Sequence, residues 1–481
     1  MNIKNMKKIV TLISLSLLLM IELVTAQSHL WGTCGSGGAH GLPGTIFRTD
    51  INGNNLDTVY SLVNSLGSFP LGTMVMANNG KFYGVTYQGG AGNFGVCYSY
   101  DPISDIFTDI HDFSTSLSFG GIANSGMLLA SNGKLYGLTE QFGMHGEGVI
   151  YCIDPNTNIY SDIYNFSLST GAYPNGILMQ LSNGKLYGMT TSGGAYNGGV
   201  IFSLNPADSV YSLLYSFDTL HGISPYYGGL LKATDGKLYG LTQQGGTNNN
   251  GVIFSFDTAT NIYTVVYDFD SIHGSHPGGS LIQATNGLLY GMTGDGGTYV
   301  EGVIFSFDIN SNSYIDLYDF NDSSQTTICR SLMQASNGLL FGTRFKSGLH
   351  QYGKKFSFDI STNIYNTKYY FDGGMYGGNP DCDIIEIPDS LTTGIKAFNK
   401  KEGLTLYPNP TSGIFTLSYN SQLSIHNSQL KIYDVLGQEV YTQAITNPNQ
   451  TTIIISQLSN GVYFYQVINN KETVRGKFVK E

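Results

Sequence analysis

A 21-residue stretch that recurs along the chain constrains its fold more than any other feature. The clearest copy, KLYGLTQQGGTNNNGVIFSFD, runs from Lys237 to Asp257. Five more near-copies have the same length and another is one residue longer; they occupy His29–Asp50, Lys81–Asp101, Lys134–Asp154, Lys185–Asn205, Leu288–Asp308 and Leu339–Asp359. Because self-similarity at a fixed period is the signature of repeat architectures, we expect a tandem array of one structural unit.

The repeat has a period close to 50 residues. Its turn glycines, Gly80, Gly133, Gly184, Gly236, Gly287 and Gly338, are separated by 53, 51, 52, 51 and 51 residues. Each period contains four short apolar runs bounded by turn residues, for example Ser280–Ala284, Leu288–Thr293, Val303–Phe307 and Tyr314–Phe320. Four antiparallel strands per period predict the blade of an all-β propeller; a β-helix is the main alternative.

The connections between these strands have recognisable turn chemistry. Asn-Gly or Asp-Gly separates strands one and two in all six internal copies, from Asn79-Gly80 to Asn337-Gly338, and predicts type I′ turns. Segments such as Asp257–Asn261 join strands three and four, and their Asp and Asn side chains can cap the turn. A glycine inside strand two, such as Gly240, predicts the close approach of a neighbouring backbone.

The two ends of the array predict how the ring closes. The first copy begins at strand two, with Leu30-Trp31-Gly32, and no strand one precedes it. After the last copy, Gly377–Ile387 aligns with Gly274–Ala284. We therefore expect Asp383–Ile387 to supply the missing strand, which gives seven four-stranded blades over residues 29–388 and leaves no open sheet edge.

The N-terminus has the composition of a secretory signal peptide. Three lysines, Lys4, Lys7 and Lys8, precede an apolar run from Ile9 to Ile21 and a small-residue site that ends at Ala26. This order predicts a cleaved signal peptide over residues 1–26, with an uncleaved membrane anchor as the alternative. No other stretch is apolar enough to cross a bilayer, and residues 389–403 read as a polar linker.

The C-terminal region from residue 404 to 481 has strand signals without the repeat period. The runs Ile414–Tyr419, Leu430–Val435, Thr452–Ile455 and Val462–Ile468 predict a small β-sandwich. Three segments, LTLYPNPTSGIFTLS, LKIYDVLGQEVY and ISQLSNGVYFYQV, followed by the terminal GKFVKE, resemble the type A C-terminal sorting domain of the type IX secretion system of Bacteroidetes. An ordinary carbohydrate-binding or adhesive sandwich is the alternative.

The resemblance to the sorting domain has implications for location and partners. It implies that the type IX secretion machinery is a partner and that the protein is secreted or attached to the outer cell surface. It also implies a sorting motif at Tyr407, Pro408, Asn409 and Pro410. The LYG-T, GG and G-V-I-F-S-F-D elements resemble the GloVer tandem-repeat family, which implies a propeller-like surface protein without defined chemistry.

Composition excludes several classes of function. Only 12% of residues are charged, the formal net charge is −11, and Lys and Arg do not cluster, so nucleic acid is not an expected partner. The five cysteines show no CxxC spacing, which argues against a zinc site or a redox dithiol. We interpret Cys97 and Cys152 as small apolar residues, and a disulfide between Cys329 and Cys382 remains an alternative.

Candidate ligand-binding residues lie in the long loops that join strand four to strand one and strand two to strand three. These loops share one face of a propeller, where exposed aromatic rings can stack on sugars or pack on a partner. The candidates are Tyr226, Tyr227, His221, His273, His276, Tyr196 and Tyr299. The alternative is that these side chains only stiffen the loops, and that Asp218-His221 and Asp270-His273 are products of repeat duplication rather than metal or acid–base sites.

No catalytic constellation emerges from the inner strands. A glycosidase needs a pair of carboxyl groups near the channel. The equivalent inner positions of the seven copies hold Met76, Leu129, Gln180, Lys232, Gln283, Gln334 and Glu386. We therefore expect a binding or adhesion module for glycan or protein that has no cofactor, no metal and no catalytic activity; a polysaccharide hydrolase or lyase and a purely structural repeat protein are the alternatives.

Overall fold

The computed structural model describes most of the chain, and the chain divides into two compact units, Met1–Thr392 and Thr393–Glu481. The described residues are 28–39, 43–114, 120–321, 330–348, 350–389, 404–407, 411–419, 428–433, 439–445, 450–468 and 473–480. The expected signal peptide, the segment 390–403, Cys329 and Pro408–Pro410 lie outside these ranges. Each unit is described by itself.

The first unit is built from seven four-stranded antiparallel sheets. The sheets are numbered in chain order, and the strands of each sheet are given from the innermost to the outermost. Sheet 1 contains β30 (Ile385–Pro388), β1 (Ser28–Cys34), β2 (Thr45–Asp50) and β3 (Asp57–Ser61). Sheet 2 contains β4 (Val75–Met76), β5 (Phe82–Val85), β6 (Val96–Asp101) and β7 (Ile106–Asp112). Sheet 3 contains β9 (Leu128–Leu129), β10 (Leu135–Thr139), β12 (Val149–Asp154) and β13 (Ile159–Asn165), and sheet 4 contains β14 (Met179–Gln180), β15 (Leu186–Thr190), β16 (Val200–Asn205) and β17 (Val210–Ser216).

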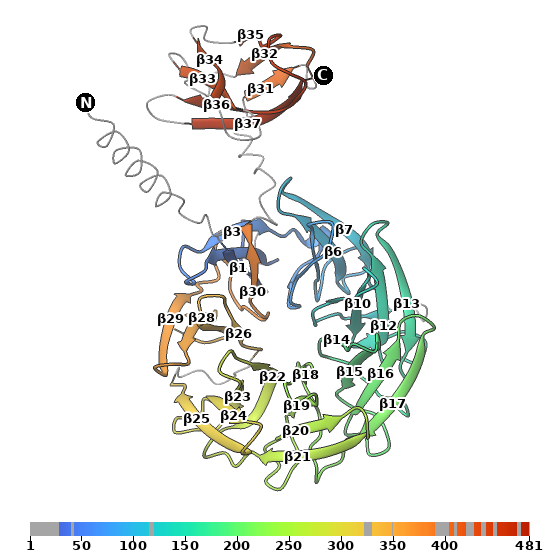
Figure 1. Cartoon of the computed structure of the whole chain (residues 1–481). Helices are drawn as coiled ribbons and strands as arrows, with labels where there is room; N and C mark the ends of the chain where they lie inside the picture. The colour runs from blue at the N-terminus through green and yellow to red at the C-terminus, as the bar shows by residue number, and fades with distance from the viewer. Residues whose placement is uncertain are drawn as a thin grey trace, which may run out of the picture. The chain divides into compact units, whose positions relative to one another are not determined.

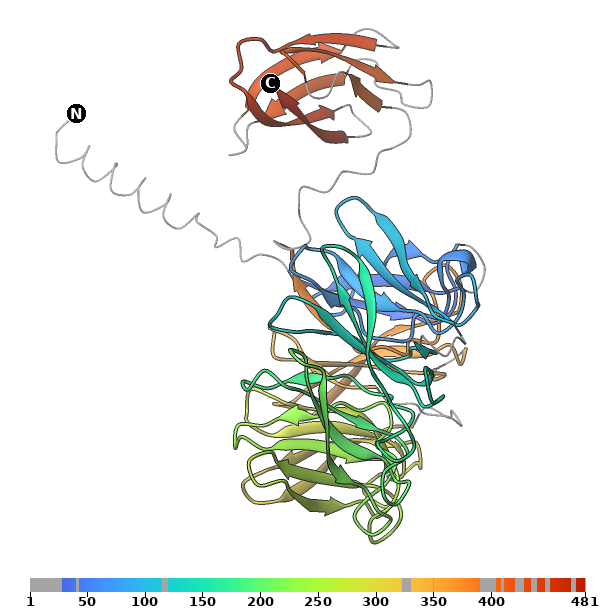
Figure 2. The same ribbon diagram turned by 90° about the vertical axis from the view of Figure 1, so that its right-hand side faces the viewer.

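Sheets 5 to 7 repeat the same order. Sheet 5 contains β18 (Leu231–Lys232), β19 (Leu238–Thr242), β20 (Val252–Asp257) and β21 (Ile262–Asp268). Sheet 6 contains β22 (Ser275–Gln283), β23 (Leu289–Asp295), β24 (Val303–Asp308) and β25 (Ser313–Asp319). Sheet 7 contains β26 (Met333–Gln334), β27 (Leu340–Arg344), β28 (Lys354–Asp359) and β29 (Ile364–Tyr370). A small pair, β8 (Gly120–Gly121) and β11 (Gln141–Phe142), accompanies sheet 3, and a short 3-10 turn spans Asn64–Leu66. Figure 1 shows the sheets following one another around a propeller-like ring, which Figure 2 shows from the side.

The turns between the first and second strands differ from the predicted type I′ geometry. In the turn of sheet 2, Gly80 has φ 78°, whereas Asn79 does not have a positive φ. The Gly80 N–H donates to the Ala77 carbonyl at 3.0 Å, and the Ala77 N–H donates to the Lys81 carbonyl at 2.9 Å. The loop is therefore a type I turn followed by a left-handed glycine, so the type I′ prediction is wrong.

The asparagine of these turns has a second role that the dipeptide rule does not anticipate. Its side-chain oxygen accepts a hydrogen bond from the backbone N–H two residues later, as between Asn79 and Lys81 at 3.1 Å. Its amide also donates to the hydroxyl of the tyrosine in LYG or its equivalent, Tyr83, at 3.0 Å. Asn132, Asn183 and Asn286 make the same bond to Tyr136, Tyr187 and Tyr290.

The glycine inside the second strand faces an aromatic ring rather than a neighbouring backbone. A Cβ at Gly240 would lie 2.4 Å from Cζ of Phe254, its cross-strand partner in the same sheet. Tyr98, Tyr151, Phe202, Phe305, Phe356 and Phe47 cover the equivalent glycines. A close approach exists, but it is made by the ring of the cross-strand partner and not by a neighbouring backbone.

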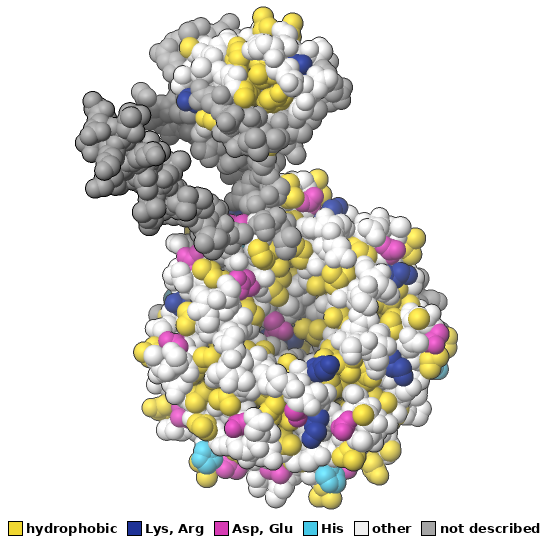
Figure 3. Space-filling view, viewed as in Figure 1, with side chains coloured by type: hydrophobic (Ala, Val, Ile, Leu, Met, Phe, Trp, Pro, Cys, Tyr) yellow, Lys and Arg dark blue, Asp and Glu magenta, His cyan; other side chains and the backbone are white. Residues whose placement is uncertain are grey.

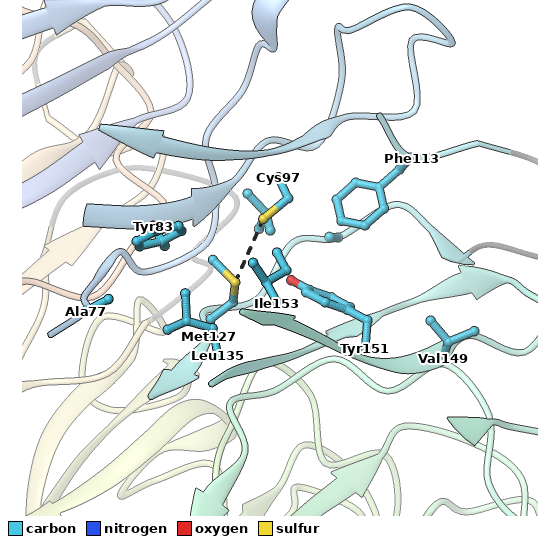
Figure 4. Packing of buried hydrophobic residues seen from close by; sticks show 11 residues of the cluster. Ala77, Tyr83, Cys97, Phe113, Met127, Leu135, Val149, Tyr151 and Ile153 are labelled. Carbon is cyan, nitrogen blue, oxygen red and sulfur yellow. Dashed lines mark hydrogen bonds between the residues drawn. The ribbon is translucent and has the colours of Figure 1, made fainter. Parts of the chain in front are cut away.

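Apolar side chains fill the space between adjacent sheets. Between sheets 2 and 3, Cys97 and Met127 lie with their sulfur atoms 4.0 Å apart, next to the buried ring of Tyr151 (Figure 4). Cys97 is fully buried and Cys152 is 5% exposed, and both are free thiols. Burial raises the pKa of Cys97, so its thiolate is disfavoured, and the residue packs as a small apolar side chain.

The outer strands carry an aromatic belt around the ring. A ring near the end of one outer strand stacks on a ring near the start of the next at six junctions, with centroid distances from 3.7 to 4.9 Å. The pairs are Tyr60–Phe107, His111–Tyr160, Tyr164–Tyr211, Tyr215–Tyr263, Tyr267–Tyr314 and Tyr318–Tyr365. Ten of the twelve stacked rings are tyrosines.

The segment after the last copy joins the first sheet. Strand β30 (Ile385–Pro388) pairs antiparallel with β1, with Ser28 opposite Pro388 and Trp31 opposite Ile385. Nδ1 of His29 lies 2.6 Å from Oδ1 of Asp389, just beyond the paired residues. The strand is one residue shorter than the expected Asp383–Ile387; it begins two residues later and ends one residue later.

The second unit contains two antiparallel sheets. One has the order β31 (Leu404–Tyr407), β32 (Ile414–Tyr419), β35 (Gln450–Ile454), and the other β34 (Glu439–Ile445), β33 (Ser428–Tyr433), β36 (Gly461–Ile468), β37 (Thr473–Lys480). Residues from both sheets share one core, which includes Leu417, Ile432, Ile453 and Tyr465. The strands at 404–407, 439–445 and 473–480 were not anticipated from the sequence.

Candidate functional site

The long loops on one side of the sheets, called the loop face here, hold the histidines that the sequence singled out. Nδ1 of His221 lies 2.9 Å from the carboxylate of Asp218, and His273 makes the same contact with Asp270 at 2.9 Å. The Asp218 carboxylate also accepts hydrogen bonds from the backbone N–H groups of Leu220 and His221. The carboxylate of each pair thus caps its own loop.

These two Asp–His loops also make contacts with the following sheet. The hydroxyl of Tyr263 donates to the carbonyl of His221 at 2.6 Å, and Tyr314 makes the equivalent bond to His273 at 2.5 Å. The loops therefore anchor the aromatic belt of the following sheet. In the described part of the chain, no group of three or more His, Cys, Asp or Glu side chains is arranged to hold a metal ion.

The remaining outer candidates do not come together. Tyr196 and Tyr299 are 69% and 55% exposed, and they occupy corresponding loops of sheets 4 and 6, with sheet 5 between them. His276 places Nδ1 3.2 Å from a carboxylate oxygen of Asp295. These side chains, with the exposed Leu220 and Ile272, form an outer rim of the loop face rather than one pocket.

Tyr226 and Tyr227 lie together in the segment that leads into the inner strand of sheet 5. Their ring centroids are 3.9 Å apart, and the Tyr226 hydroxyl donates to the Tyr227 hydroxyl at 3.0 Å. The guanidinium carbon of Arg330, which precedes the inner strand of sheet 7, lies 3.9 Å from the Tyr227 ring centroid. Arg330 Nε also donates to Oδ1 of Asp381 at 2.5 Å. We call these four residues the inner cluster.

Further polar groups surround the inner cluster. Asn124, which leads into sheet 3, donates from its side-chain amide to Glu140 at 2.9 Å. Burial raises the pKa of the Glu140 carboxyl, and the hydrogen bond from Asn124 opposes this shift only in part. Burial also raises the pKa of Tyr226, and the nearby charges of Glu140 and Asp381 raise it further. The inner cluster is thus mixed in charge and partly shielded from water.

The glutamines at the equivalent inner positions, which we considered as catalytic candidates above, make contacts between sheets. Gln283 accepts a hydrogen bond from the Thr234 N–H at 2.9 Å, and Gln334 accepts one from the Thr285 N–H at 2.8 Å. Glu386 accepts from the N–H and the hydroxyl of Ser336 at 2.7 and 2.6 Å. Each side chain ties an inner strand to the turn of the preceding sheet.

Sequence reasoning found two members of the inner cluster and missed the others. It selected Tyr226 and Tyr227 as aromatic residues in a long loop, but it did not select Arg330, Asp381 or Glu140. A signal was available, because Arg330 stands where sheets 4, 5 and 6 have glycine, at Gly176, Gly228 and Gly279. A charged residue that replaces a repeated glycine marks a departure from the scaffold pattern.

Figure 3 shows one face of the first unit. The ring of the first unit is hollowed at its centre there, and basic and acidic side chains are scattered over it rather than gathered. No helix among the described residues is long and apolar enough to cross a membrane.

Solved structures with similar folds share little sequence with the chain. A candidate 6-phosphogluconolactonase from Bacteroides fragilis matches with a TM-score of 0.51 and 13% identity, over 76% of this chain and 98% of that one. The extracellular domains of two candidate regulatory systems from B. thetaiotaomicron, one hybrid two-component and one one-component, match with TM-scores of 0.43 and 0.47 and identities of 14% and 13%.

These likenesses bear on the fold alone. The alignments cover 93% and 91% of this chain, which spans 55% and 60% of the two extracellular domains. No curated protein sequence matches the chain.

Two family models account for nearly the whole sequence. The model described as the Gloeobacter/Verrucomicrobia repeat matches residues 20–197 and 178–403. The model described as a secretion system C-terminal sorting domain matches residues 405–481 and indicates export by the type IX secretion system, to the cell surface or the medium. The chain therefore belongs to the Gloeobacter/Verrucomicrobia repeat family and ends in a sorting domain for secretion.

Proposed function

We propose that residues 29–388 form a seven-bladed β-propeller whose first blade is completed by β30, and that residues 404–481 form a β-sandwich. Seven sheets with the same strand order and the pairing of β30 with β1 support the propeller. The shared core of the two C-terminal sheets supports the sandwich. A cleaved signal peptide over residues 1–26 would deliver the chain to the periplasm before the sorting domain directs it outward.

We further propose that the protein is a binding or adhesion module that recognises glycan or protein through its loop face. The observation that carries this proposal is the inner cluster, in which two half-buried tyrosines lie beside Arg330, a charged residue where sheets 4 to 6 have glycine. Aromatic rings beside a few directed polar groups are the usual composition of a ligand site. The outer rim adds exposed apolar side chains at which a partner can make contact.

The proposed module has no catalytic activity of its own. The inner glutamines and Glu386 are engaged in hydrogen bonds between sheets, which leaves them poorly suited to the acid and nucleophile roles of a glycosidase. A polysaccharide hydrolase or lyase is the second candidate, because Glu140 is a partly buried carboxyl with a raised pKa beside the inner cluster.

Glycan arrays and binding assays on the full chain test the proposal. We expect the double variant Tyr226→Ala/Tyr227→Ala to lose binding by about tenfold or more, because it removes both rings and the support of Arg330. The matched control, Tyr196→Ala/Tyr299→Ala, removes two rings from the outer rim. Turnover of a polysaccharide without added metal would refute the binding-only function, and binding that neither double variant changes would exclude the loop face.

A further inference from the structure

An open groove lies between the inner strands of sheets 1 and 2, and we call it the inner groove. One wall is β4 with the turn that follows it, and the other is β30, on the inner side of the ring (Figure 1). The groove encloses a volume of about 510 Å³, within the usual range of about 300–1,000 Å³ for a ligand site. Its apolar lining includes Met74, Val75, Met76, Ile385, Ile387 and Pro388.

The inner groove occupies the place where an ordinary junction has a turn and a glutamine. Gln180 of sheet 4, for example, accepts a hydrogen bond from the Ser131 N–H in the turn of sheet 3 at 2.7 Å. Met76 stands at the same position of sheet 2. Sheet 1 has no corresponding turn, because β30 and β1 come from opposite ends of the array. The space is therefore left open and apolar.

The groove combines a fixed floor with accessible walls. Met74 and Ile387 belong to the core between sheets 1 and 2, in which they are 3% and 9% exposed. Val75, Met76 and Ile385 are half-buried at the border of that core. Methionine is unbranched and adapts its shape to what it contacts, so the walls can close on an apolar group that enters.

Acidic groups accompany this apolar lining. The Glu386 carboxylate lines the groove; it accepts two hydrogen bonds from sheet 7 and retains further lone pairs. Asp389, which contacts His29, follows the last lining residue of β30. On the opposite wall, Lys81 follows the lining turn and interacts with the carboxylate of Asp101. Carboxylates therefore outnumber ammonium groups around the groove, which favours a cationic occupant.

We propose that the inner groove docks an apolar side chain from a basic segment of a partner protein. An aliphatic or aromatic side chain fits the methionine and isoleucine walls, and flanking lysine or arginine complements Glu386 and Asp389. A fatty acid would bring a second carboxylate to these acids. A sugar would place hydroxyl groups against apolar walls, and the described lining holds no aromatic ring on which it could stack.

The inner groove is separate from the loop face. It lies beside the turn between the first and second strands of sheet 2, at the opposite end of the sheet from the long loops. The inference therefore goes beyond the proposed function, and either can fail without the other.

Fluorescence polarisation with labelled hexapeptides and the full chain tests the partner class. The basic probes are KKLFKK, KKIWKK and KKVMKK; KKAAKK lacks the apolar side chains, and EELFEE reverses the charge. We expect at least one basic probe to bind about tenfold or more tightly than KKAAKK and EELFEE, because only the basic probes satisfy both the apolar walls and the carboxylates. Raising the salt concentration should weaken this binding.

The variants use residues that the repeat already contains. Met76→Gln places an amide in the groove, and glutamine is native at this position in sheets 4, 6 and 7, so the fold should accept it. We expect it to weaken binding of the basic probe by about tenfold. Leu129→Gln is the matched control, because it makes the same amide at the equivalent position of sheet 3, outside the groove lining, and should bind like the parent chain.

A second variant tests the charge. Glu386→Gln keeps a hydrogen-bond acceptor for Ser336, as Gln334 provides for Thr285, but removes the negative charge. We expect it to weaken binding of the basic probe by about threefold and to reduce the dependence on salt. Calorimetric unfolding of each variant shows whether the chain is still folded.

Four outcomes would overturn the inner groove as a docking site. They are the absence of binding by every basic probe, equal binding of KKAAKK or EELFEE, equal effects of Met76→Gln and Leu129→Gln, and binding of decanoate without binding of any peptide. Each of them leaves the loop face untouched, because the double variant Tyr226→Ala/Tyr227→Ala tests that face with different ligands.

Discussion

The ordinary junctions between sheets and the seam between sheets 7 and 1 are built from different interactions. At an ordinary junction such as that of sheets 4 and 5, Tyr215 stacks on Tyr263 at 4.1 Å. At the seam, Leu56 takes the place of the second tyrosine, and Tyr369 has no ring of sheet 1 against it in the described part of the chain. The aromatic belt is therefore interrupted where the two ends of the array meet.

Acidic residues of the segment Pro380–Pro388, called the closing segment here, hold the seam instead. Asp381 pairs with Arg330, Asp383 accepts from the Ser331 N–H at 2.8 Å, and Glu386 accepts from Ser336. At the corresponding positions of sheet 6, Ser280 and Gln283 accept the equivalent hydrogen bonds through neutral groups. The seam thus has charged acceptors at positions where ordinary junctions have hydroxyl and amide groups.

The difference between the seam and the ordinary junctions follows from how the chain connects the strands. In sheets 2 to 7 a short turn connects the inner strand to its neighbour, whereas β30 and β1 belong to opposite ends of the array. An inner strand without such a turn must be held entirely by non-covalent contacts. Hydrogen bonds to ionised acceptors are roughly twice as strong as neutral ones, which suits the closing segment.

The largest expected effect comes from removing the closing segment. Deletion of residues 380–388 exposes the edge of β1 and the core around Ile384 and Ile387, and we expect a loss of about 4 kcal/mol and a fall in unfolding temperature of about 10 °C. Calorimetry of the full chain measures both. Deletion of residues 391–399 is the length-matched control, and equal melting of the two deletions would refute the role of the seam.

A buried lysine at the seam gives a smaller effect that depends on pH. Lys355 stands where the repeats have isoleucine, and its ammonium donates to the Thr49 hydroxyl at 2.5 Å. Burial lowers the pKa of Lys355 to about 7, so the folded state disfavours the charged form. Folding therefore carries the full cost of the charge below pH 7, and stability rises between pH 7 and the unfolded pKa near 10.5.

We expect Lys355→Ile to stabilise the chain by about 3 kcal/mol at pH 6 and by much less at pH 10, because the wild-type penalty disappears as the unfolded lysine loses its proton. Urea unfolding at the two pH values measures the change. Lys355→Met, which keeps the length of the side chain, is the control for packing. A gain of the same size at both pH values would show that the charge of Lys355 is not the cause.

The smallest expected effect is the difference in stability lost when a tyrosine is replaced in the aromatic belt and when one is replaced at the seam. Tyr215→Leu removes a stacked ring at an ordinary junction and should cost about 1.5 kcal/mol, whereas Tyr369→Leu at the seam should cost about 0.5 kcal/mol. Each tyrosine makes an edge-to-face contact with the phenylalanine two residues later, Phe217 or Phe371, so the main difference between the two sites is the stack. Equal losses in urea unfolding would mean that stacking contributes nothing to the junctions.

Much of the scaffold follows from the sequence because its signals are local and repeated. Period, turn residues and apolar runs mark the strands, and the Asp and Asn caps of the turns between strands three and four appear as expected, as in the 2.8 Å bond from the Ala259 N–H to Asp257. The type I′ prediction for the turn at Asn79-Gly80 is wrong, because the dipeptide rule does not consider the hydrogen bond from the Asn79 side chain to Tyr83. The covering of Gly240 by Phe254 was also missed, because it depends on cross-strand register.

The candidate site was less accessible to sequence reasoning. Tyr226 and Tyr227 could be selected as aromatic loop residues, but Asp381 lies more than 150 residues away and Arg330 more than 100. Nothing local indicates that a guanidinium from sheet 7 covers a ring from sheet 5 and pairs with the closing segment. His221 and His273 differ in that their contacts with Asp218 and Asp270 are local, and their role in ligand binding stays a prediction.

The repeat, its strands and the sorting domain could be inferred from the residues alone, because they depend on short-range periodicity and on motifs within one segment. Which side chains meet at the inner strands, and how the two ends of the array are joined, could be seen only in the folded chain. The physical reason is that a ring brings equivalent positions of distant repeats together, so departures from the repeat, such as Arg330, Lys355 and Asp381, acquire partners that no local pattern specifies.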